Sequence, residues 1–287
     1  MYEKRELMWL YGLTSAHVGS GDNLSYVDLP IQREKHTGFP KIEASSLKGA
    51  IRHHVEKKTD TNTVESIFGK GSGEEDSSPS EVAFSDARIL FFPVKSAKGI
   101  FAWVTCPMVI ERFVQDCKLF GGFEELNLDC DKEAICTSDA LKISVSKVML
   151  EELVFESEDS TKEEAFKAWI CQLMQKLFLP TELQEAAFKS RVIMIPNDDF
   201  KYFTMQATEV ITRNRINSET GMADGGALFT EEYLPPESIM YSLMFLKREI
   251  EKMCVLKTHL NGNIIQIGGN ATLGKGLFSV KFVKGAD

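Results

Sequence analysis

The sequence predicts an α+β fold, and three observations support this expectation. Residues 161–178 carry apolar side chains at helical spacing on one side of the segment. Residues 82–94 (VAFSDARILFFPV) and residues 101–106 are rich in β-forming residues and are expected to be strands. Short strands separated by helical segments and long loops are typical of α+β domains, in which helices cover an antiparallel sheet.

The composition is that of a globular protein. The chain has 287 residues, of which 43% are hydrophobic and 26% charged, enough for a sizeable core. No apolar run approaches the roughly 18 residues of a membrane-spanning helix, and the N-terminal segment has no signal-peptide pattern. We therefore expect a cytoplasmic protein without a membrane partner. The six cysteines form no CxxC pair, which favours free thiols over a structural zinc site.

The charge is unevenly distributed along the chain. The net charge is −9, yet residues 33–58 contain seven Lys or Arg against three Glu, a local excess of four positive charges. A nucleic-acid partner needs one basic surface rather than a basic protein. The composition is therefore compatible with RNA binding, although it does not require it.

The first half of the chain divides into recognisable elements. Residues 4–14 suit a first strand, and a polar loop with several Gly and Pro follows over residues 17–40. A helix is expected from an N-cap at Ser45 or Ser46 to about Lys58. The remaining segments are a mobile loop rich in Gly and Ser, a helix, an acidic insertion without periodicity and a strand, over residues 69–81, 109–120, 122–146 and 147–155.

The second half contains a predicted hairpin and a glycine-rich end. Residues 208–234 form two extended arms around a tip with three glycines, which predicts a long β-hairpin. A strand is expected over residues 237–246, and it could continue into a short helix. The C-terminal segment, residues 264–283, is expected to hold a strand, a Gly-rich loop and a last strand.

Two candidate sites lie in the first loop and on the hairpin. His17 could transfer a proton near neutral pH, and Asp28 could hold a metal or orient a nucleophile. Alternatively, Asp28 only begins a turn with Pro30 and His17 only hydrogen-bonds the loop. Strand alternation puts Glu231 and Tyr233 on one face, where a carboxylate and a phenol could serve acid–base or metal chemistry, unless they are exposed residues of a hairpin arm.

Two further candidates could bind phosphate. The segment from Gly269 to Lys275 fits GxxxxGK, the beginning of a nucleotide-binding P-loop, but Gly276 replaces the required Ser or Thr and a strand is expected to follow. A nucleotide site is therefore disfavoured, leaving a phosphate-approaching loop or a plain turn. Lys48 and Arg52 lie four residues apart on one helix flank, where they suit phosphate or form a solvated basic face.

Read together, three segments resemble the RAMP superfamily. They are LTSAHVGSGDNLSYVDLPIQREKHTGFPKIEASSLKGAIR at the start, RNRINSETGMADGGALFTEEYLP in the hairpin and IGGNATLGKGLFSV at the end. Within the superfamily, they most resemble the repeated backbone subunit of the type III-B CRISPR effector complex, the Cmr complex. The resemblance covers both ends and about a third of the chain.

This resemblance implies a fold and a function. The fold would be a single RAMP domain over residues 1–287, a modified RRM-like (ferredoxin-like) palm with inserted finger elements and a thumb hairpin at residues 208–234. Copies of the chain would stack head to tail along crRNA, beside other Cmr subunits. The complex would cut guide-paired target RNA at regular intervals, with a divalent metal ion, Mg²⁺ or Mn²⁺.

The resemblance also implies roles for individual residues. The catalytic aspartate and metal ligand of the family would be Asp28, assisted by His17, Glu231 and Tyr233. RNA-binding positions would fall on the first helix and the Gly-rich loop, at Ser46, Lys48, Arg52, Gly268, Gly269, Gly274, Lys275 and Gly276. Two alternatives stay open: a non-catalytic crRNA-binding scaffold, and a metal-independent endoribonuclease that processes the guide precursor.

Overall fold

The computed structural model describes residues 4–22, 26–70, 78–118, 123, 125–126, 128, 130, 133–157, 159–177, 179–214, 228–247 and 250–283. Within these residues the fold is α+β, as predicted. The expected hairpin tip and the middle of the expected mobile loop, at residues 215–227 and 71–77, lie outside the described residues.

One large mixed sheet organises the described part of the chain. Its main path runs β13-β14-β1-β12-β4-β5-β9-β6, with β2 paired to β4 and β3 paired to β12. All pairs are antiparallel except β5 with β9. In chain order, the strands are β1 (Lys4–Gly12), β2 (Lys41–Ile42), β3 (Val82–Phe84), β4 (Ala87–Lys95), β5 (Phe101–Thr105), β6 (Ile135–Cys136), β9 (Val192–Met194), β12 (Ile239–Leu246), β13 (Ile264–Gln266) and β14 (Leu277–Phe282).

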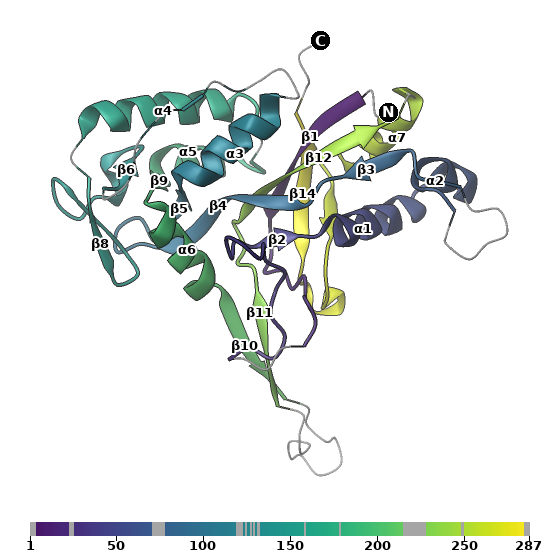
Figure 1. Ribbon diagram of the computed structural model, residues 1–287, viewed down its shortest axis with the longest axis horizontal. Coiled ribbons are helices and arrows are strands. Elements are labelled where there is room, and N and C mark those ends of the chain that lie inside the picture. Colours follow the sequence, from purple (N-terminus) through teal and green to yellow (C-terminus); the bar gives the residue numbers. More distant parts are fainter. Residues whose placement is uncertain are drawn as a thin grey trace.

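Helices cover the sheet in two groups (Figure 1). The helices α1 (Ala44–Glu56), α2 (Thr61–Phe68) and α7 (Ile250–Leu260) lie towards the β13 end, where α1 contacts β13 and α7 contacts β14. The helices α3 (Pro107–Cys117), α4 (Ser160–Met174) and α5 (Glu182–Arg191) lie towards the β6 end, where α4 contacts β6 and α5 contacts β5. Helix α6 (Asn197–Gln206) leads from that group into the hairpin.

Two hairpins stand apart from the sheet. Strands β7 (Lys147–Leu150) and β8 (Leu153–Glu156) form one, where the sequence predicted a single strand. Strands β10 (Glu209–Arg213) and β11 (Phe229–Tyr233) pair antiparallel and project from the body of the molecule (Figure 1), so the predicted arms of the 208–234 hairpin are confirmed.

The central strands are buried on both faces. Residues Leu7 to Tyr11 of β1 are each at most 3% exposed, and every residue of β12 except Phe245 is buried. Such strands read as continuous apolar runs because neither face meets water. Burial on both faces explains why apolar and polar residues alternate only weakly in residues 4–14, although the predicted strand is there.

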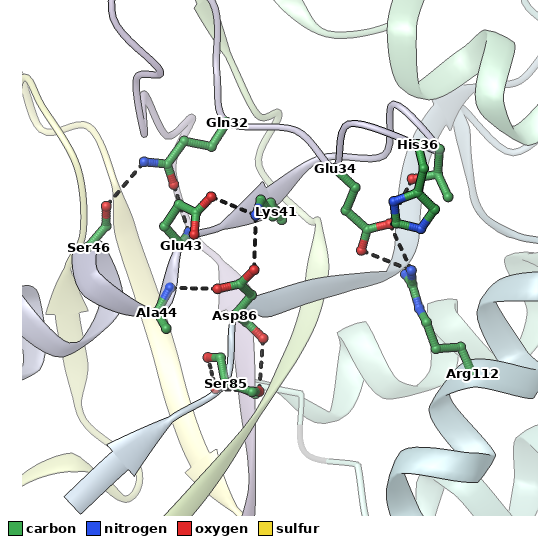
Figure 2. Close-up of polar contacts among 12 residues, drawn as sticks. Gln32, Glu34, His36, Lys41, Glu43, Ala44, Ser46, Ser85, Asp86 and Arg112 are labelled. Carbon is green, nitrogen blue, oxygen red and sulfur yellow. Dashed lines mark hydrogen bonds and ion pairs between the residues drawn. The ribbon is translucent and has the colours of Figure 1, made fainter.

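The predicted N-cap of the first helix was wrong. Helix α1 begins at Ala44, and neither Ser45 nor Ser46 caps it. The amide of Ala44 instead donates to Asp86 Oδ1 at 2.9 Å, from the loop between β3 and β4. A helix N-terminus leaves its first amides without intrahelical acceptors, and here a distant carboxylate satisfies one of them (Figure 2). The buried stripe of Leu47, Ile51 and Val55 fixes the rest of the helix.

Several other boundaries differ from the expectations. The predicted strand 82–94 is interrupted at Ser85 and Asp86, so β3 and β4 pair separately with β12. Part of the predicted acidic insertion enters the main sheet, since β6 pairs with β9 and is followed by the 3-10 turn η2 (Asp139–Leu141). Helices α2, α5 and α6 were not predicted from the sequence.

Candidate nuclease and RNA-binding site

The first loop lies along the edge of the hairpin. Ala16 and Leu234 exchange both backbone hydrogen bonds, each at 2.9 Å. Further along the loop, Leu29 donates to Thr230 O and accepts from the amide of Glu232, both at 3.0 Å. Strand β11 thus has β10 on one side and the first loop on the other. Two segments about two hundred residues apart in the sequence form one backbone unit.

A buried polar cluster lies where the loop, the hairpin and the C-terminal loop meet. Glu231 and Tyr233 share one face of β11, as alternation predicted, and the Tyr233 hydroxyl donates to Glu231 Oε2 at 2.6 Å. His17 joins them, with Nε2 at 3.5 Å from Glu231 Oε1 and Nδ1 at 2.7 Å from the Glu232 carbonyl oxygen. Glu231 is 5% exposed and Tyr233 is fully buried, so the alternative of an exposed hairpin arm was wrong.

Two residues that the sequence analysis missed complete this cluster. Arg213 on β10 pairs with Glu231, Nε to Oε2 at 2.8 Å, and also donates to the Tyr233 hydroxyl. Asn270 Nδ2 donates to Glu231 Oε1 at 2.7 Å and to the Tyr233 hydroxyl at 3.0 Å. Burial, followed by the neighbouring Glu231, raises the pKa of Tyr233 to about 12. The phenol is therefore a proton-carrying donor at neutral pH rather than a base.

Asp28 lies apart from this cluster, on the opposite face of β11. Its side chain is exposed, and its Oδ2 accepts hydrogen bonds from the amide and the hydroxyl of Thr230, at 2.7 and 2.8 Å. These bonds hold the pKa of the Asp28 carboxyl below its usual value, the Thr230 amide having the largest effect. At neutral pH the group is a carboxylate, which can act as a base or bind a cation.

The structure thus separates the four predicted catalytic residues into two sets. His17, Glu231 and Tyr233 are together and largely covered, whereas the contacts of the described residues do not link Asp28 to any of them. The same described residues contain no group of three or more His, Cys, Asp or Glu side chains suited to a metal ion. Any cation at Asp28 would need other ligands, which suits Mg²⁺ because it is often held by one or two carboxylates plus substrate phosphates.

The Gly-rich loop packs closely against the first loop. A Cβ on Gly268 would lie 2.3 Å from the His17 carbonyl oxygen, and one on Gly276 would lie 2.1 Å from Ile267 O. The amide of Gly269 donates to His17 O at 2.8 Å. The first contact assigns Gly268 to docking against the first loop, and the second assigns Gly276 to closure of the Gly-rich loop on itself. At both positions only glycine fits so close to backbone.

The other predicted positions of this loop have different surroundings. A Cβ on Gly274 would meet no atom within 4 Å. The Lys275 ammonium lies 4.9 Å from the centre of the Tyr233 ring, which ties it to the buried cluster. Strand β14 follows the loop, as expected from the sequence, so the disfavoured P-loop interpretation gains no support from the fold.

The predicted RNA-binding residues of α1 are half-buried. Arg52 Nε pairs with Glu56 Oε1 at 2.7 Å, and its Nη1 donates to Gly69 O at 3.2 Å. Burial and the nearby Arg52 charge lower the pKa of Lys48. The Ser46 hydroxyl accepts from Gln32 Nε2 at 3.2 Å (Figure 2), so Ser46 helps to hold the first loop against the helix.

Comparison with known proteins identifies the family. A family model described as the RAMP superfamily matches residues 9–279. The chain belongs to the RAMP superfamily. It is 38% identical to the Pyrococcus furiosus protein named CRISPR system Cmr endoribonuclease Cmr4, over 96% of this chain and 95% of that one.

Solved structures of Cmr proteins share the fold. Oligomeric Cmr4 from Pyrococcus furiosus has a TM-score of 0.79 at 30% identity, covering 99% of both chains. A chain of the type III-B Cmr-beta complex bound to cognate target RNA has a TM-score of 0.75 at 19% identity, covering 98% of both chains. In this RAMP chain, no helix within the described residues is long and apolar enough to cross a membrane.

A second polar network was also missed in this RAMP chain. On the face of β11 opposite Glu231, the Glu232 carboxylate pairs with Arg33 and accepts from the Ile31 amide at 2.9 Å and the Thr208 hydroxyl at 2.8 Å. The alternation of side chains along a strand places Glu232 on the face opposite Glu231. Nothing in the sequence marked Arg33 as its partner.

The far end of the first loop and the strand that follows it are fixed by three further ion pairs (Figure 2). Arg112 Nη1 on α3 donates to both carboxylate oxygens of Glu34, at 2.8 and 2.9 Å. Lys41 bridges Glu43 at 2.6 Å and Asp86 at 3.0 Å. Three of the seven Lys and Arg in residues 33–58 therefore have acidic partners within the chain, because Arg33, Lys41 and Arg52 all form ion pairs.

Proposed function

We propose that this chain is the crRNA-binding backbone subunit of a type III-B CRISPR effector complex, and that it cuts guide-paired target RNA. The similarity to Cmr endoribonuclease Cmr4 over nearly the full length of both chains supports the assignment. The observation that supports the proposed nuclease activity is the exposed Asp28 carboxylate, which Thr230 holds ionised at the edge of the hairpin.

The palm of this subunit would be RRM-like. In support, the strands β14-β1-β12-β4 are adjacent in that order, α1 lies between β1 and β4 in the chain, and α7 lies between β12 and β14. This is two strand–helix–strand units in one antiparallel sheet, the arrangement of a ferredoxin-like fold. The hairpin at residues 208–234 would be the thumb.

The chemistry that we propose uses the nucleophile already present in RNA. The 2′-OH must lose a proton and attack the adjacent phosphorus in line with the leaving oxygen. Asp28 is the group in position to take that proton or to hold a divalent cation, Mg²⁺ or Mn²⁺, together with phosphate oxygens. When bound, such a cation would neutralise charge on the phosphate.

His17, Glu231 and Tyr233 would contribute in a different way. Their polar atoms already bond one another, Asn270 and Arg213, which leaves them covered in this structure. We propose that they hold the first loop, the thumb and the Gly-rich loop together, so that Asp28 is presented to the RNA. Their predicted catalytic role remains a prediction.

RNA contacts would come mainly from backbone amides and basic side chains. Lys48 on α1 and the region around Gly274 are the open candidates, because Arg52, Gly268 and Gly276 have partners within the chain. Further copies of this chain, stacked head to tail, and other Cmr subunits would be its protein partners, in the cytoplasm. Because phosphate contacts release counterions, crRNA affinity should fall steeply with salt.

The test is to incubate the purified chain with crRNA, a complementary target RNA and Mg²⁺, and to map the cuts. The proposal predicts a ladder of products with fixed spacing that disappears with EDTA. An intact target bound in a filament would instead identify a scaffold subunit. Cutting of the guide precursor that persists in EDTA would identify a processing enzyme.

A further inference from the structure

The side chain of Asp28 is oriented by one residue of the hairpin. Thr230 donates to Asp28 Oδ2 twice, from its amide at 2.7 Å and its hydroxyl at 2.8 Å. The Asp28 amide donates back to the Thr230 hydroxyl oxygen at 3.0 Å. The two residues therefore form a closed ring of hydrogen bonds between the first loop and β11.

Geometry favours the carboxylate as the acceptor for the Thr230 hydroxyl. That hydroxyl has one proton and two possible acceptors, since the Tyr26 carbonyl oxygen lies 3.4 Å away and Asp28 Oδ2 only 2.8 Å. A charged acceptor forms the stronger hydrogen bond. The hydroxyl proton is therefore assigned to Asp28, and its lone pairs are left for the Asp28 amide.

Within the part of the chain that the structure describes, the hydrogen bonds of the Asp28 side chain all come from Thr230. Asp28 is exposed, so its hydrogen bonds compete with water and contribute little to folding stability. Their clear effect is to fix the direction of the carboxylate relative to β11. The backbone is fixed as well, because Leu29 donates to Thr230 O at 3.0 Å.

We propose that Thr230 is the positioning residue for Asp28, and that the hairpin thereby sets the direction of the carboxylate towards the target RNA. This inference rests on the proposed function, because it assigns Asp28 to the cleavage reaction. Because Thr230 belongs to β11, this strand of the thumb would also orient the Asp28 carboxylate.

The chain offers a matched control on the neighbouring strand. Thr212 on β10 is paired with Thr230 across the hairpin and is exposed. Thr212→Val makes the same chemical change on the same ladder, but among the described residues no contact joins Thr212 to Asp28. Valine matches threonine in shape and in β propensity, so Thr230→Val and Thr212→Val should both fold.

The experiment uses the assembled complex with crRNA, at saturating target RNA and Mg²⁺. We expect Thr230→Val to slow the single-turnover cut by roughly 10- to 100-fold, the effect of misplacing a reacting group by about 1 Å. Target affinity should stay within about twofold, Thr230→Ser should restore most of the rate, and Thr212→Val should cut like the unaltered chain.

A second readout needs neither metal nor activity. The Thr230 amide donates to the Asp28 carboxylate, so Asp28→Ala should speed hydrogen exchange at that amide in the isolated chain, with the amides of β12 unchanged.

An unaltered rate in Thr230→Val, a failure of Thr230→Ser to restore it, a loss explained by weaker target binding, or unchanged Thr230 exchange would each overturn the inference. The proposed function fails separately, if Asp28→Asn cuts at the full rate.

Discussion

Glu232 on β11 forms an ion pair with Arg33 in the first loop, 199 residues earlier in the chain, and both side chains are largely covered. Arg33 Nη1 also donates to Gly38 O and to Thr204 O at the end of α6, each at 2.9 Å. The pair therefore joins the first loop, the hairpin and the helix that precedes it. It holds the backbone on which Asp28 is placed.

Removing one charge of this pair should destabilise the protein. Glu232→Gln keeps the shape of the side chain but leaves Arg33 without its anion, and we expect the free energy of unfolding to fall by about 3 kcal/mol. Urea denaturation measures it. Glu156→Gln is the control, since the Lys147–Glu156 pair is about half exposed and should change stability by less than about 0.5 kcal/mol. Equal losses in both variants would contradict the account.

The buried Tyr233 phenol should make stability fall at alkaline pH. Its pKa is raised to about 12 in the folded chain, mainly by burial, from an ordinary value of 10.0. Between these values the unfolded chain releases the proton while the folded chain keeps it. The stabilisation is therefore complete below about pH 10 and is lost as pH rises towards 12.

Comparing Tyr233→Phe with the unaltered chain isolates this effect. The urea midpoint should fall less between pH 9 and pH 11 in Tyr233→Phe, because that variant has no phenol to titrate. Tyr26→Phe, which changes a fully exposed tyrosine, should behave like the unaltered chain. A Tyr233→Phe curve parallel to the unaltered one would show that the phenol is not held as described.

Substitution of Gly268 should disturb the docking of the Gly-rich loop. Gly268→Ala places a Cβ 2.3 Å from His17 O at a φ of +90°, and should cost about 3 kcal/mol of unfolding free energy. Gly274→Ala has a similar φ of +71° but open space, and should cost about 1 kcal/mol. Thermal or urea unfolding would rank the two variants, and the reverse order would contradict the docking contact.

The cysteines should fall into two classes of reactivity. All six are thiols outside disulfides, as the sequence predicted, but only Cys171 and Cys254 are exposed. Burial raises the pKa of Cys106 to about 12 and that of Cys136 to about 11, so thiolate is scarce at these positions. Two thiols should react quickly with Ellman's reagent in the native chain and six in denaturant. Rapid reaction of more than two native thiols would be inconsistent with the fold.

Local patterns in the sequence predicted the elements that depend on neighbours in the chain. Period-two alternation placed Glu231 and Tyr233 on one face, and the glycines between the arms of residues 208–234 indicated a hairpin. Helix α2 could have been found in the same way, because Asp60 accepts from the Thr63 amide as an N-cap and Val64, Ile67 and Phe68 form a buried stripe.

Partners that are distant in the sequence could not be predicted. Two serines were the obvious caps for α1, but the carboxylate of Asp86 reaches the Ala44 amide from another loop. His17 and Asp28 occupy one loop and were expected to act together. In the structure His17 contacts Glu231, whereas Asp28 contacts Thr230, whose side chain lies on the opposite face of β11. Thr230 carries no chemical signal of its own, and only its contact with Asp28 shows its importance.

The most direct test of the central claim is target cleavage by Asp28→Asn in the assembled complex. Asparagine is close to aspartate in shape but carries no charge, so it can neither take the proton from the 2′-OH nor supply the negative charge that a carboxylate ligand gives a cation. The account predicts loss of all regularly spaced cuts, with crRNA and target affinities unchanged within a few-fold. Full cleavage by Asp28→Asn at the same positions would contradict it.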